Sequence, residues 1–270
     1  KLVTGIRGEK VKYEYETNIE PGTKGRIQVS PNRDDDFTEF SPKLAINHKI
    51  NDELAIFANY SRGNRAPQTT DLYRIQSKQI PGGAKSEKLD SLEIGLRGKF
   101  SIFNLELVGF NMRKENYFFR DSQGFNVENG KTTHRGFEIN FLAEFNQFFQ
   151  IENSTSFAEH EYDFDHSPNG IKSGNQIDSA PELLANTRFI FTPKERTRIE
   201  LEWEKIDSYP VDERNAHFYK GHNVFNLRAK TPINENLSIG IYVNNITDKS
   251  YANRADFAFG SYRYFVGQKR

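Results

Sequence analysis

Apolar and polar residues alternate along much of this chain, and this period of two constrains the fold more than any other feature. Residues 198–205 place apolar side chains at alternate positions: Ile199, Leu201 and Trp203. Glutamates fill the intervening positions: Glu200, Glu202 and Glu204. Comparable alternation occurs at residues 91–100, 137–143, 225–229 and 237–244. Because successive side chains of a β-strand point to opposite faces, each segment is predicted to be a strand with one apolar and one polar face.

The connections between these segments alternate between short and long. Short connections are predicted at residues 50–53, 99–101, 146–147, 193–196 and 232–236. Long polar connections are predicted at residues 63–88, 115–131, 163–180, 208–220 and 247–261. An antiparallel meander places alternate connections at opposite ends of its sheet, so one end should carry tight turns and the other end large loops. This arrangement is typical of membrane β-barrels.

The predicted strands are long, and the run at residues 148–162 is one of several that exceed ten residues. Soluble strands usually have about five or six residues, whereas roughly 9 to 11 tilted residues cross a bilayer. Counting along the chain gives about twelve strands, the first at residues 2–15 and the last beginning at Tyr264. The predicted fold class is therefore all-β, a transmembrane antiparallel barrel, because an open sheet edge in lipid leaves backbone groups unpaired.

Composition narrows the possible functions. The 270 residues include 37 basic and 37 acidic side chains, so no net field favours nucleic acid as a partner. There is no cysteine, which excludes disulfides and thiolate metal sites. No apolar run approaches the roughly 18 residues of a membrane helix. Walker, GxGxxG, GxSxG and HExxH motifs are absent, so we expect neither an enzyme nor a bound cofactor or metal.

Several motifs occur in order along most of the chain. They are FANYSRGNRAPQTTDLY, KLDSLEIGLRG, THRGFEINF, APELLANTRFIFTP, YKGHNVFNLRAKTPI, NNITDKSYANRADF and RYFVGQKR. Together they resemble the C-terminal part of a TonB-dependent outer-membrane receptor, over nearly the whole chain from Phe40 onward. The resemblance implies a barrel of about 22 strands with an N-terminal plug in its lumen. It also implies import of a scarce ligand, such as an iron chelate, cobalamin or a sugar, across the outer membrane of a Gram-negative bacterium.

The resemblance covers only part of such a receptor. Residues 1–270 are expected to form the C-terminal portion of the barrel, with the plug, the TonB box, the first strands and the final strand outside this chain. The first residues lack a targeting pattern, so the chain is interpreted as a mature protein or a fragment. Asn64 stands where many relatives have an aromatic residue, and Val266 stands where proline is usual. We expect an open half-barrel with two unpaired edges that aggregates in isolation.

The favoured function is TonB-dependent import, with an iron-siderophore or similar chelate as the first choice of ligand. The expected partners are the TonB complex through the plug, the small-molecule ligand, and outer-membrane lipid. One alternative is a structural or adhesive barrel, which predicts no plug-coding segment upstream of Lys1. The other is a barrel enzyme, a lipase or protease with its site near the loops, which requires a Ser/His/Asp or paired-carboxylate constellation.

Tyrosine and arginine residues near the predicted loops are the candidate ligand contacts: Arg62, Arg65, Tyr73, Tyr209, Tyr251 and Arg254. Aromatic faces and guanidinium groups suit flat or anionic iron chelates. Aromatic residues at strand ends have a second interpretation, a girdle at the level of the lipid headgroups. The basic segment SRGNRAP is first interpreted as the place where a strand leaves the membrane, and ligand contact by Arg62 or Arg65 is the second hypothesis.

Other titratable side chains receive structural interpretations. The three glutamates of residues 198–205 are predicted to face the lumen, with Arg228 as a cross-strand partner. The stretch AEHEYDFDHS and the run RDDD at residues 33–36 are predicted to be solvated loop. Three histidines are predicted to be isolated, each beside the end of a strand: His134, His217 and His222.

The stretch KINDELAIFANYSRGNRAPQTTDLY combines these features. Its INDE tetrad is predicted to be a periplasmic turn. The row predicted to face lipid comprises Leu54, Ile56, Ala58 and Tyr60. The row predicted to face inward comprises Ala55, Phe57, Asn59 and Ser61. Phe57 is the large apolar member of the inward row, and we expect it to pack against the plug.

Overall fold

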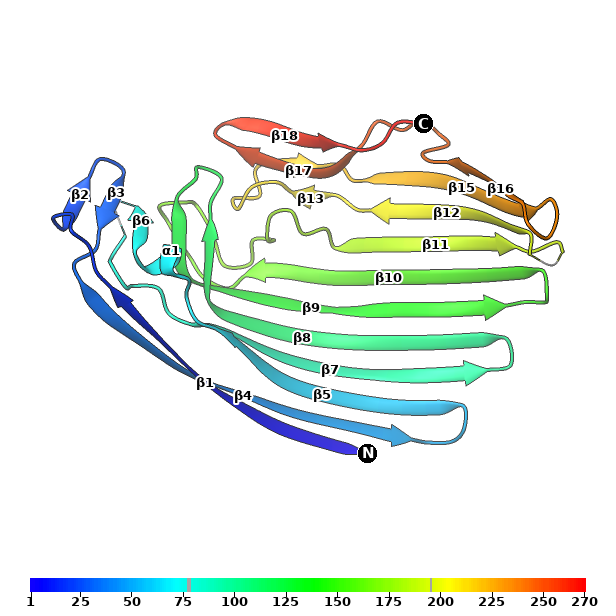
Figure 1. Cartoon of the computed structure of the whole chain (residues 1–270), viewed down its shortest axis with the longest axis horizontal. Helices are drawn as coiled ribbons and strands as arrows, with labels where there is room; N and C mark the ends of the chain where they lie inside the picture. Colours follow the sequence, from blue (N-terminus) through cyan, green and yellow to red (C-terminus); the bar gives the residue numbers. More distant parts are fainter. Residues whose placement is uncertain (77–78, 195) are drawn as a thin grey trace.

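One antiparallel sheet of eleven strands forms most of the structure. The computed structural model describes residues 1–76, 79–194 and 196–270. The strands of the sheet are β1 (Leu2–Tyr15), β4 (Arg33–Lys49), β5 (Leu54–Arg65), β7 (Glu87–Phe100), β8 (Phe103–Arg120), β9 (Asn126–Glu144), β10 (Phe149–Tyr162), β11 (Leu183–Phe191), β12 (Arg198–Ile206), β15 (His222–Pro232) and β16 (Ser238–Val243). Their order in space follows their order in sequence, and Figure 1 shows them as a curved wall. The predicted all-β meander is confirmed, with eleven strands in the sheet against about twelve expected.

The connections differ in length at the two ends of the sheet (Figure 1). Tight turns join strands at one end, as between β4 and β5, where the amide of Ile50 donates to the carbonyl of Leu54 at 2.9 Å. The Asn51 side chain closes this turn by accepting from two backbone amides, so the turn predicted from INDE is confirmed as a turn. Two predicted connections, residues 63–88 and 193–196, contain positions (77, 78 and 195) that lie outside the described residues.

The long-loop end contains small elements of its own. They are β2 (Gly22–Lys24), β3 (Ile27–Val29), α1 (Thr69–Leu72), β6 (Arg74–Gln76), β13 (Tyr209–Pro210), β14 (Phe218–Tyr219), β17 (Ala252–Ala258) and β18 (Ser261–Val266). In the described part of the chain no helix is long and apolar enough to cross a membrane. Buried apolar side chains gather here in two clusters: Leu72, Tyr73 and Ala84, and Tyr209, Val211, Tyr219, Ala252 and Ala255. The apolar core therefore lies among the loops.

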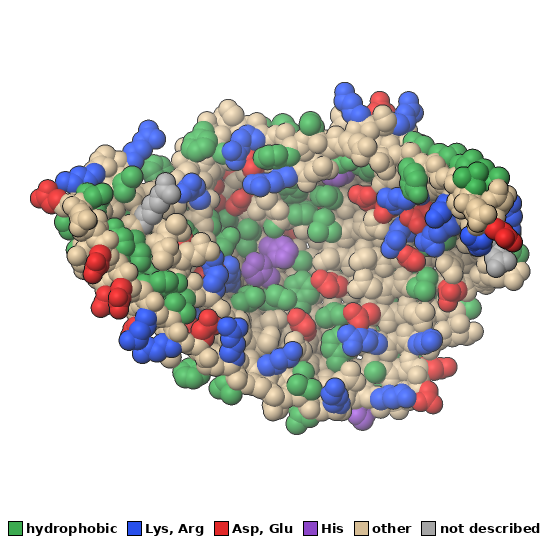
Figure 2. Space-filling model, in the orientation of Figure 1, with side chains coloured by type: hydrophobic (Ala, Val, Ile, Leu, Met, Phe, Trp, Pro, Cys, Tyr) green, Lys and Arg blue, Asp and Glu red, His purple; other side chains and the backbone are tan. Residues whose placement is uncertain are grey.

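The wall has an apolar and a polar face. Ala58 on β5 lies opposite Ile94 on β7, within the row predicted to face lipid. Ile94 is 60% exposed, as expected for a side chain that packs against lipid rather than protein. The other face carries Phe57, whose ring centroid lies 4.5 Å from the guanidinium of Arg97. We call this second face the inner wall, and Figure 2 shows that it is hollowed. The contact of Phe57 with a plug stays a prediction.

One expected loop is wrong because both flanking strands continue through it. β8 runs to Arg120 and β9 begins at Asn126, so most of the predicted loop 115–131 is strand. Aromatic side chains at alternate positions support this extension, since the rings of Tyr117 and Phe119 stack at 4.9 Å between centroids. Side-chain packing above the sheet therefore outweighs the polar character of the segment.

The predicted loop 247–261 also contains strand. β17 and β18 pair with each other in a separate hairpin outside the main sheet. Phe259 and Gly260 connect them with positive φ angles of 53° and 78°, the backbone geometry of a tight hairpin turn. The strand expected to begin at Tyr264 is therefore half of this hairpin and not a continuation of the wall.

Candidate functional site

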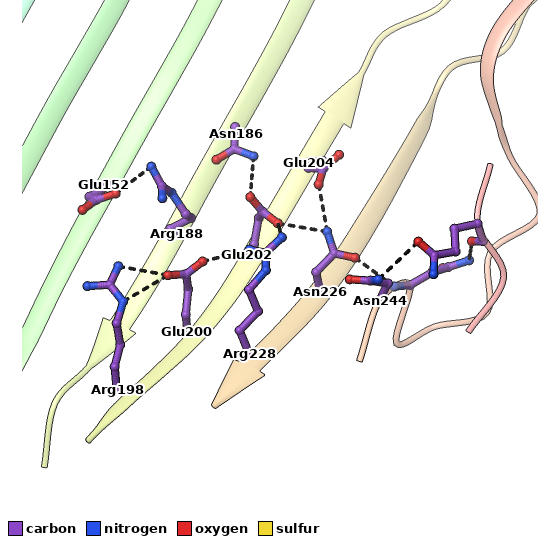
Figure 3. Close-up of polar contacts among 12 residues, drawn as sticks. Glu152, Asn186, Arg188, Arg198, Glu200, Glu202, Glu204, Asn226, Arg228 and Asn244 are labelled. Atoms are coloured by element: carbon purple, nitrogen blue, oxygen red, sulfur yellow. Dashed lines mark hydrogen bonds and ion pairs between the residues drawn. The ribbon is translucent and has the colours of Figure 1, made fainter. Parts of the chain in front are cut away.

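The inner wall carries a group of ion pairs on β12 and β15. Glu200 lies directly opposite Arg228. Arg228 donates to Glu200 Oε1 at 2.9 Å, and its other terminal nitrogen lies 2.7 Å from Glu202 Oε2 (Figure 3). The predicted cross-strand partner is confirmed. Glu200 is 7% exposed and Glu202 is 8% exposed, so water compensates little of their charge and the guanidinium does so instead.

The same network extends across β11, β12 and β15 through three further contacts (Figure 3): Arg198 with Glu200 (2.9 Å), Asn186 with Glu202 (3.0 Å) and Asn226 with Glu204 (2.8 Å). A separate ion pair beside it joins Arg188 on β11 to Glu152 on β10 at 2.7 Å. Each of these carboxylates accepts from a guanidinium or amide nitrogen. The wall therefore presents fixed charges of both signs, an arrangement that suits contact with a polar solute rather than proton transfer.

Arg65 is the last residue of β5, and its side chain lies on the inner wall. Its guanidinium donates two hydrogen bonds to Glu87 on β7, at 2.9 and 3.1 Å. The ammonium of Lys114 lies 3.2 Å from the same carboxylate, and the amide of Phe118 donates to it at 3.0 Å. Because 49% of the Arg65 side chain stays exposed, this guanidinium is held in place and still accessible to a solute.

Tyr73 follows α1 and packs against the N-terminal strands. Its ring stacks on Tyr15 with 4.4 Å between centroids, and its hydroxyl donates to Asp35 at 2.8 Å. Burial raises the pKa of the Tyr73 hydroxyl, and the Asp35 carboxylate raises it further. The neutral phenol therefore stays a hydrogen-bond donor, and 7% of this residue is exposed.

Arg62 lies three residues before Arg65 and on the opposite face of β5. It makes a bidentate ion pair with Asp90, with both nitrogen to oxygen distances at 2.8 Å. The hydroxyl of Tyr60 donates to the same carboxylate at 2.8 Å. Tyr60 belongs to the row predicted to face lipid, so Arg62 lies on the outer face at the loop end of the strand. The structure separates the two arginines of SRGNRAP.

Tyr209, Tyr251 and Arg254 belong to one loop cluster around β17. The Tyr209 hydroxyl accepts from a backbone amide of β17 at 2.9 Å, and this residue is 5% exposed. The ring of Tyr251 lies 4.6 Å from that of His222. Arg254 pairs with Asp256 at 3.0 Å while 62% of its side chain is exposed. Arg254 is therefore the accessible member of the three.

The prediction of isolated histidines is wrong. His134 Nδ1 lies 2.8 Å from His160 Nδ1, across β9 and β10. The other two contact aromatic side chains: His217 stacks on Phe257 at 3.8 Å between centroids, and His222 Nδ1 lies 2.8 Å from the Tyr219 hydroxyl. Strand register brings together residues that are far apart in sequence. The available signal for the first pair was that both histidines occupy inward positions of neighbouring strands.

The prediction of solvated loop at AEHEYDFDHS and RDDD is also corrected. The residues AEHEY belong to β10, and RDDD belongs to β4. Glu159 pairs with Arg135 on β9 at 2.6 Å. Asp35 accepts from the Tyr73 hydroxyl, as described above. AEHEY and RDDD lie in strands because the neighbouring strands are long enough to pair with them, whereas DFDHS follows the end of β10 and lies in the loop, as predicted.

The sequence matches a model of a known family. This model, described as "TonB dependent receptor-like, beta-barrel", matches residues 1–246. The metal-pseudopaline receptor CntO of Pseudomonas aeruginosa is 20% identical over 261 residues, which cover 93% of this chain and 35% of that receptor. The chain thus spans about a third of this curated relative.

Solved structures share the fold over the whole chain. The ferric-catecholate import receptor Fiu from E. coli K12 has a TM-score of 0.77 at 17% identity, covering 100% of this chain and 41% of Fiu. The copper transporter OprC has a TM-score of 0.78 at 17% identity, covering 100% of this chain and 43% of OprC. At these identities the likeness shows the fold alone.

Proposed function

This chain belongs to the TonB-dependent receptor family, within its β-barrel domain, and from that membership we propose that it forms part of a receptor that imports a metal chelate. The family resemblance seen in the sequence motifs and the location in the Gram-negative outer membrane are confirmed. In such barrels the tight turns face the periplasm and the long loops face the outside. The long-loop end and the adjoining inner wall are then the first surfaces that a ligand meets.

The proposed ligand is a ferric siderophore or a similar chelate. Its support is the chemistry named for the relatives: metal-pseudopaline for CntO, ferric catecholate for Fiu and copper for OprC. Each is a metal or a complex of one. In the proposed receptor a plug domain outside residues 1–270 would link the barrel to the TonB complex, which would supply the energy.

The observation that carries this proposal is the accessible guanidinium of Arg65 on the inner wall. Its bonds to Glu87 hold it in place, so binding an anionic chelate costs little further side-chain ordering. Further proposed contacts are Tyr73 and Arg254. Supporting roles are proposed for the remaining candidates: Tyr209 and Tyr251 within the loop cluster, and Arg62 on the outer face.

Uptake of radiolabelled ferric chelates tests the proposal. A strain lacking the gene should lose energy-dependent uptake of the cognate chelate and regain it when the full gene is restored. Arg65→Gln should weaken the apparent affinity about 10- to 100-fold, because a hydrogen bond to a charged group contributes about 1.5–3 kcal/mol. Arg135→Gln, at an exposed outer-face arginine of β9 that pairs with Glu159, is the matched control and should bind as the wild type does.

The two levels of the proposal fail separately. Undiminished uptake of every ferric chelate in the deletion strain would reject import of this ligand class. Normal affinity in Arg65→Gln, with uptake lost in the deletion strain, would reject only the assigned contact.

A further inference from the structure

Three strands of the inner wall place one methionine and two histidines in a row. Met112 on β8 lies opposite His134 on β9, and His134 lies opposite His160 on β10. Directly opposed residues on one face of a sheet have Cβ atoms about 4.5–5.5 Å apart. All three side chains line one hollow of about 480 Å³. Figure 2 shows histidine side chains near the middle of the hollowed face.

The two imidazoles already face each other through their Nδ1 atoms, which are 2.8 Å apart. A hydrogen bond between two rings needs one protonated and one unprotonated nitrogen, so one ring presents a lone pair toward the other. Bonds from a metal to imidazole are about 2.0–2.1 Å long, so two nitrogens on one trigonal ion lie roughly 3.5 Å apart. The rings need to separate by less than about 1 Å, and the adjoining hollow gives them room.

Thr132 fixes the orientation of His134. Its Oγ1 lies 2.9 Å from His134 Nε2, and the residue is 1% exposed. When the hydroxyl accepts a hydrogen bond from Nε2, the ring proton is held on that nitrogen and Nδ1 keeps its lone pair. An outer hydrogen bond of this kind is the usual partner of a metal-binding imidazole. Thr132 is therefore a positioning residue.

The charged groups around the hollow allow a small cation to enter. Lys114 lines the hollow, but its ammonium lies 3.2 Å from Glu87 and 4.1 Å from the ring centroid of Tyr117. Glu138 also lines the hollow and contributes negative charge. Apolar side chains complete the lining: Leu89, Phe110, Ala158 and Ile177. Such surroundings favour an ion of low charge, because a highly charged ion costs more to desolvate.

The donor atoms select the metal. Imidazole nitrogen and thioether sulfur together favour copper in its reduced state over the hard cations that prefer oxygen. A third His, Cys, Asp or Glu ligand does not join the two histidines, because within residues 1–76, 79–194 and 196–270 no group of three or more such side chains is placed to hold a metal ion. The remaining donor beside them is the thioether of Met112. We therefore propose that the inner wall binds copper(I) through His134 Nδ1, His160 Nδ1 and the Met112 thioether. The site stands on these contacts and does not depend on which chelate the receptor imports.

The test uses the full-length receptor in detergent micelles, titrated with copper(I) against a colorimetric chelator. The wild type should hold one more copper ion per chain than the double variant His134→Gln/His160→Gln. Met112→Leu should weaken binding about tenfold or more, because it keeps the side-chain volume and removes the sulfur. Thr132→Val, which removes the hydroxyl, should weaken copper binding by about 10- to 100-fold. Thr132→Ser, which keeps the hydroxyl, should bind copper as the wild type does.

His48→Gln is the matched control, since this exposed histidine lies opposite Ile56 on the outer face. X-ray absorption of the wild type should detect sulfur bound to copper, a result that needs no variant to fold. Equal copper binding in the wild type and the double variant would overturn the proposal. So would wild-type affinity in Met112→Leu, or the absence of sulfur around the bound copper.

Discussion

Arg228 is the residue on which the charged network of the inner wall depends. Its guanidinium pairs with both Glu200 and Glu202. When methionine replaces it, Glu200 keeps Arg198 as a partner, whereas Glu202 loses its guanidinium partner. We expect Arg228→Met to lower the free energy of unfolding by about 1–3 kcal/mol, the cost of a covered carboxylate without its partner. This expected loss of stability is smaller than that for a fully buried ion pair, because 37% of the Arg228 side chain is exposed. Urea unfolding in lipid vesicles measures it.

The double variant Glu202→Gln/Arg228→Met is the control for this prediction. It removes the carboxylate together with its cation, so it should recover most of the lost stability. A single variant as stable as the wild type would show that water, and not Arg228, compensates the charge of Glu202.

Glu213 makes the loop cluster sensitive to pH. Burial raises the pKa of its carboxyl, although Ser122 donates to it from its amide at 3.1 Å and its hydroxyl at 2.9 Å. When residues 211–217 form a closed loop against Ser122, the Glu213 carboxyl binds its proton more tightly than it does when this loop opens to water. Closure is favoured fully below the ordinary glutamate pKa of 4.5 and weakens as the pH rises above it.

Amide hydrogen exchange of residues 211–217 tests this dependence. Protection factors, corrected for intrinsic exchange, should be lower at about pH 7.5 than at about pH 5. Glu213→Gln should remove the dependence, because the amide stays neutral at both pH values. Protection that increases with pH would contradict the prediction.

The residue contacts that the sequence predicted are those between immediate cross-strand neighbours of opposite charge. Arg228 was identified this way, because it and the glutamates of β12 occupy inward positions. The contact of His134 with His160 was missed, because it depends on the register of β9 and β10, which long strands and turn geometry set together. Contacts between loops, such as that of Ser122 with Glu213, were not predicted, because no periodic pattern in the sequence indicates them.

Gly136 sets the spacing of the β9 and β10 strands. A Cβ atom there would lie 2.7 Å from Ala158 Cα, and even closer to the Phe157 carbonyl. We expect Gly136→Ala to lower the free energy of unfolding by about 1–3 kcal/mol through overpacking. Gly109→Ala on β8 is the matched control, since its nearest neighbour would be the Ile94 carbonyl at 3.9 Å.

Thermal unfolding in detergent compares the two glycine variants. Gly109→Ala should be as stable as the wild type or slightly more stable, because alanine restricts the unfolded chain. Equal stability of both variants would mean that the backbones of β9 and β10 can separate at Gly136 without cost.

The existence and faces of most strands were predicted because period-two alternation is a local property. The extents of β8, β9 and β17 were not, because aromatic stacking and hairpin turns extend pairing into polar segments. Polar side chains indicate contact with water, but they do not exclude a strand. Where a strand extends beyond the membrane, both of its faces contact water while its backbone stays paired with the neighbouring strands.

The sheet as a whole ends in two strands, β1 and β16, that each pair on one side only within the described residues. Apolar side chains at both edges are exposed, with Ile6 at 75% and Ile241 at 57%. We expect residues 1–270, refolded alone in detergent, to associate through these edges into aggregates of varied size. Size-exclusion chromatography with light scattering measures this. A monodisperse monomer that resists heat would instead indicate closure of a small barrel.

The pairing of charges on the inner wall affects how quickly a ligand arrives. Several of its carboxylates, Glu152, Glu200 and Glu202, lie within 3 Å of a guanidinium, and the chain carries 37 basic and 37 acidic residues. Beyond a Debye length of about 8 Å, such a surface exerts little pull on a dissolved ion. Ligand association should therefore proceed at a rate nearly independent of ionic strength. Recognition then begins at contact, when the ligand meets the exposed part of an arginine such as Arg65, which a carboxylate already holds in position.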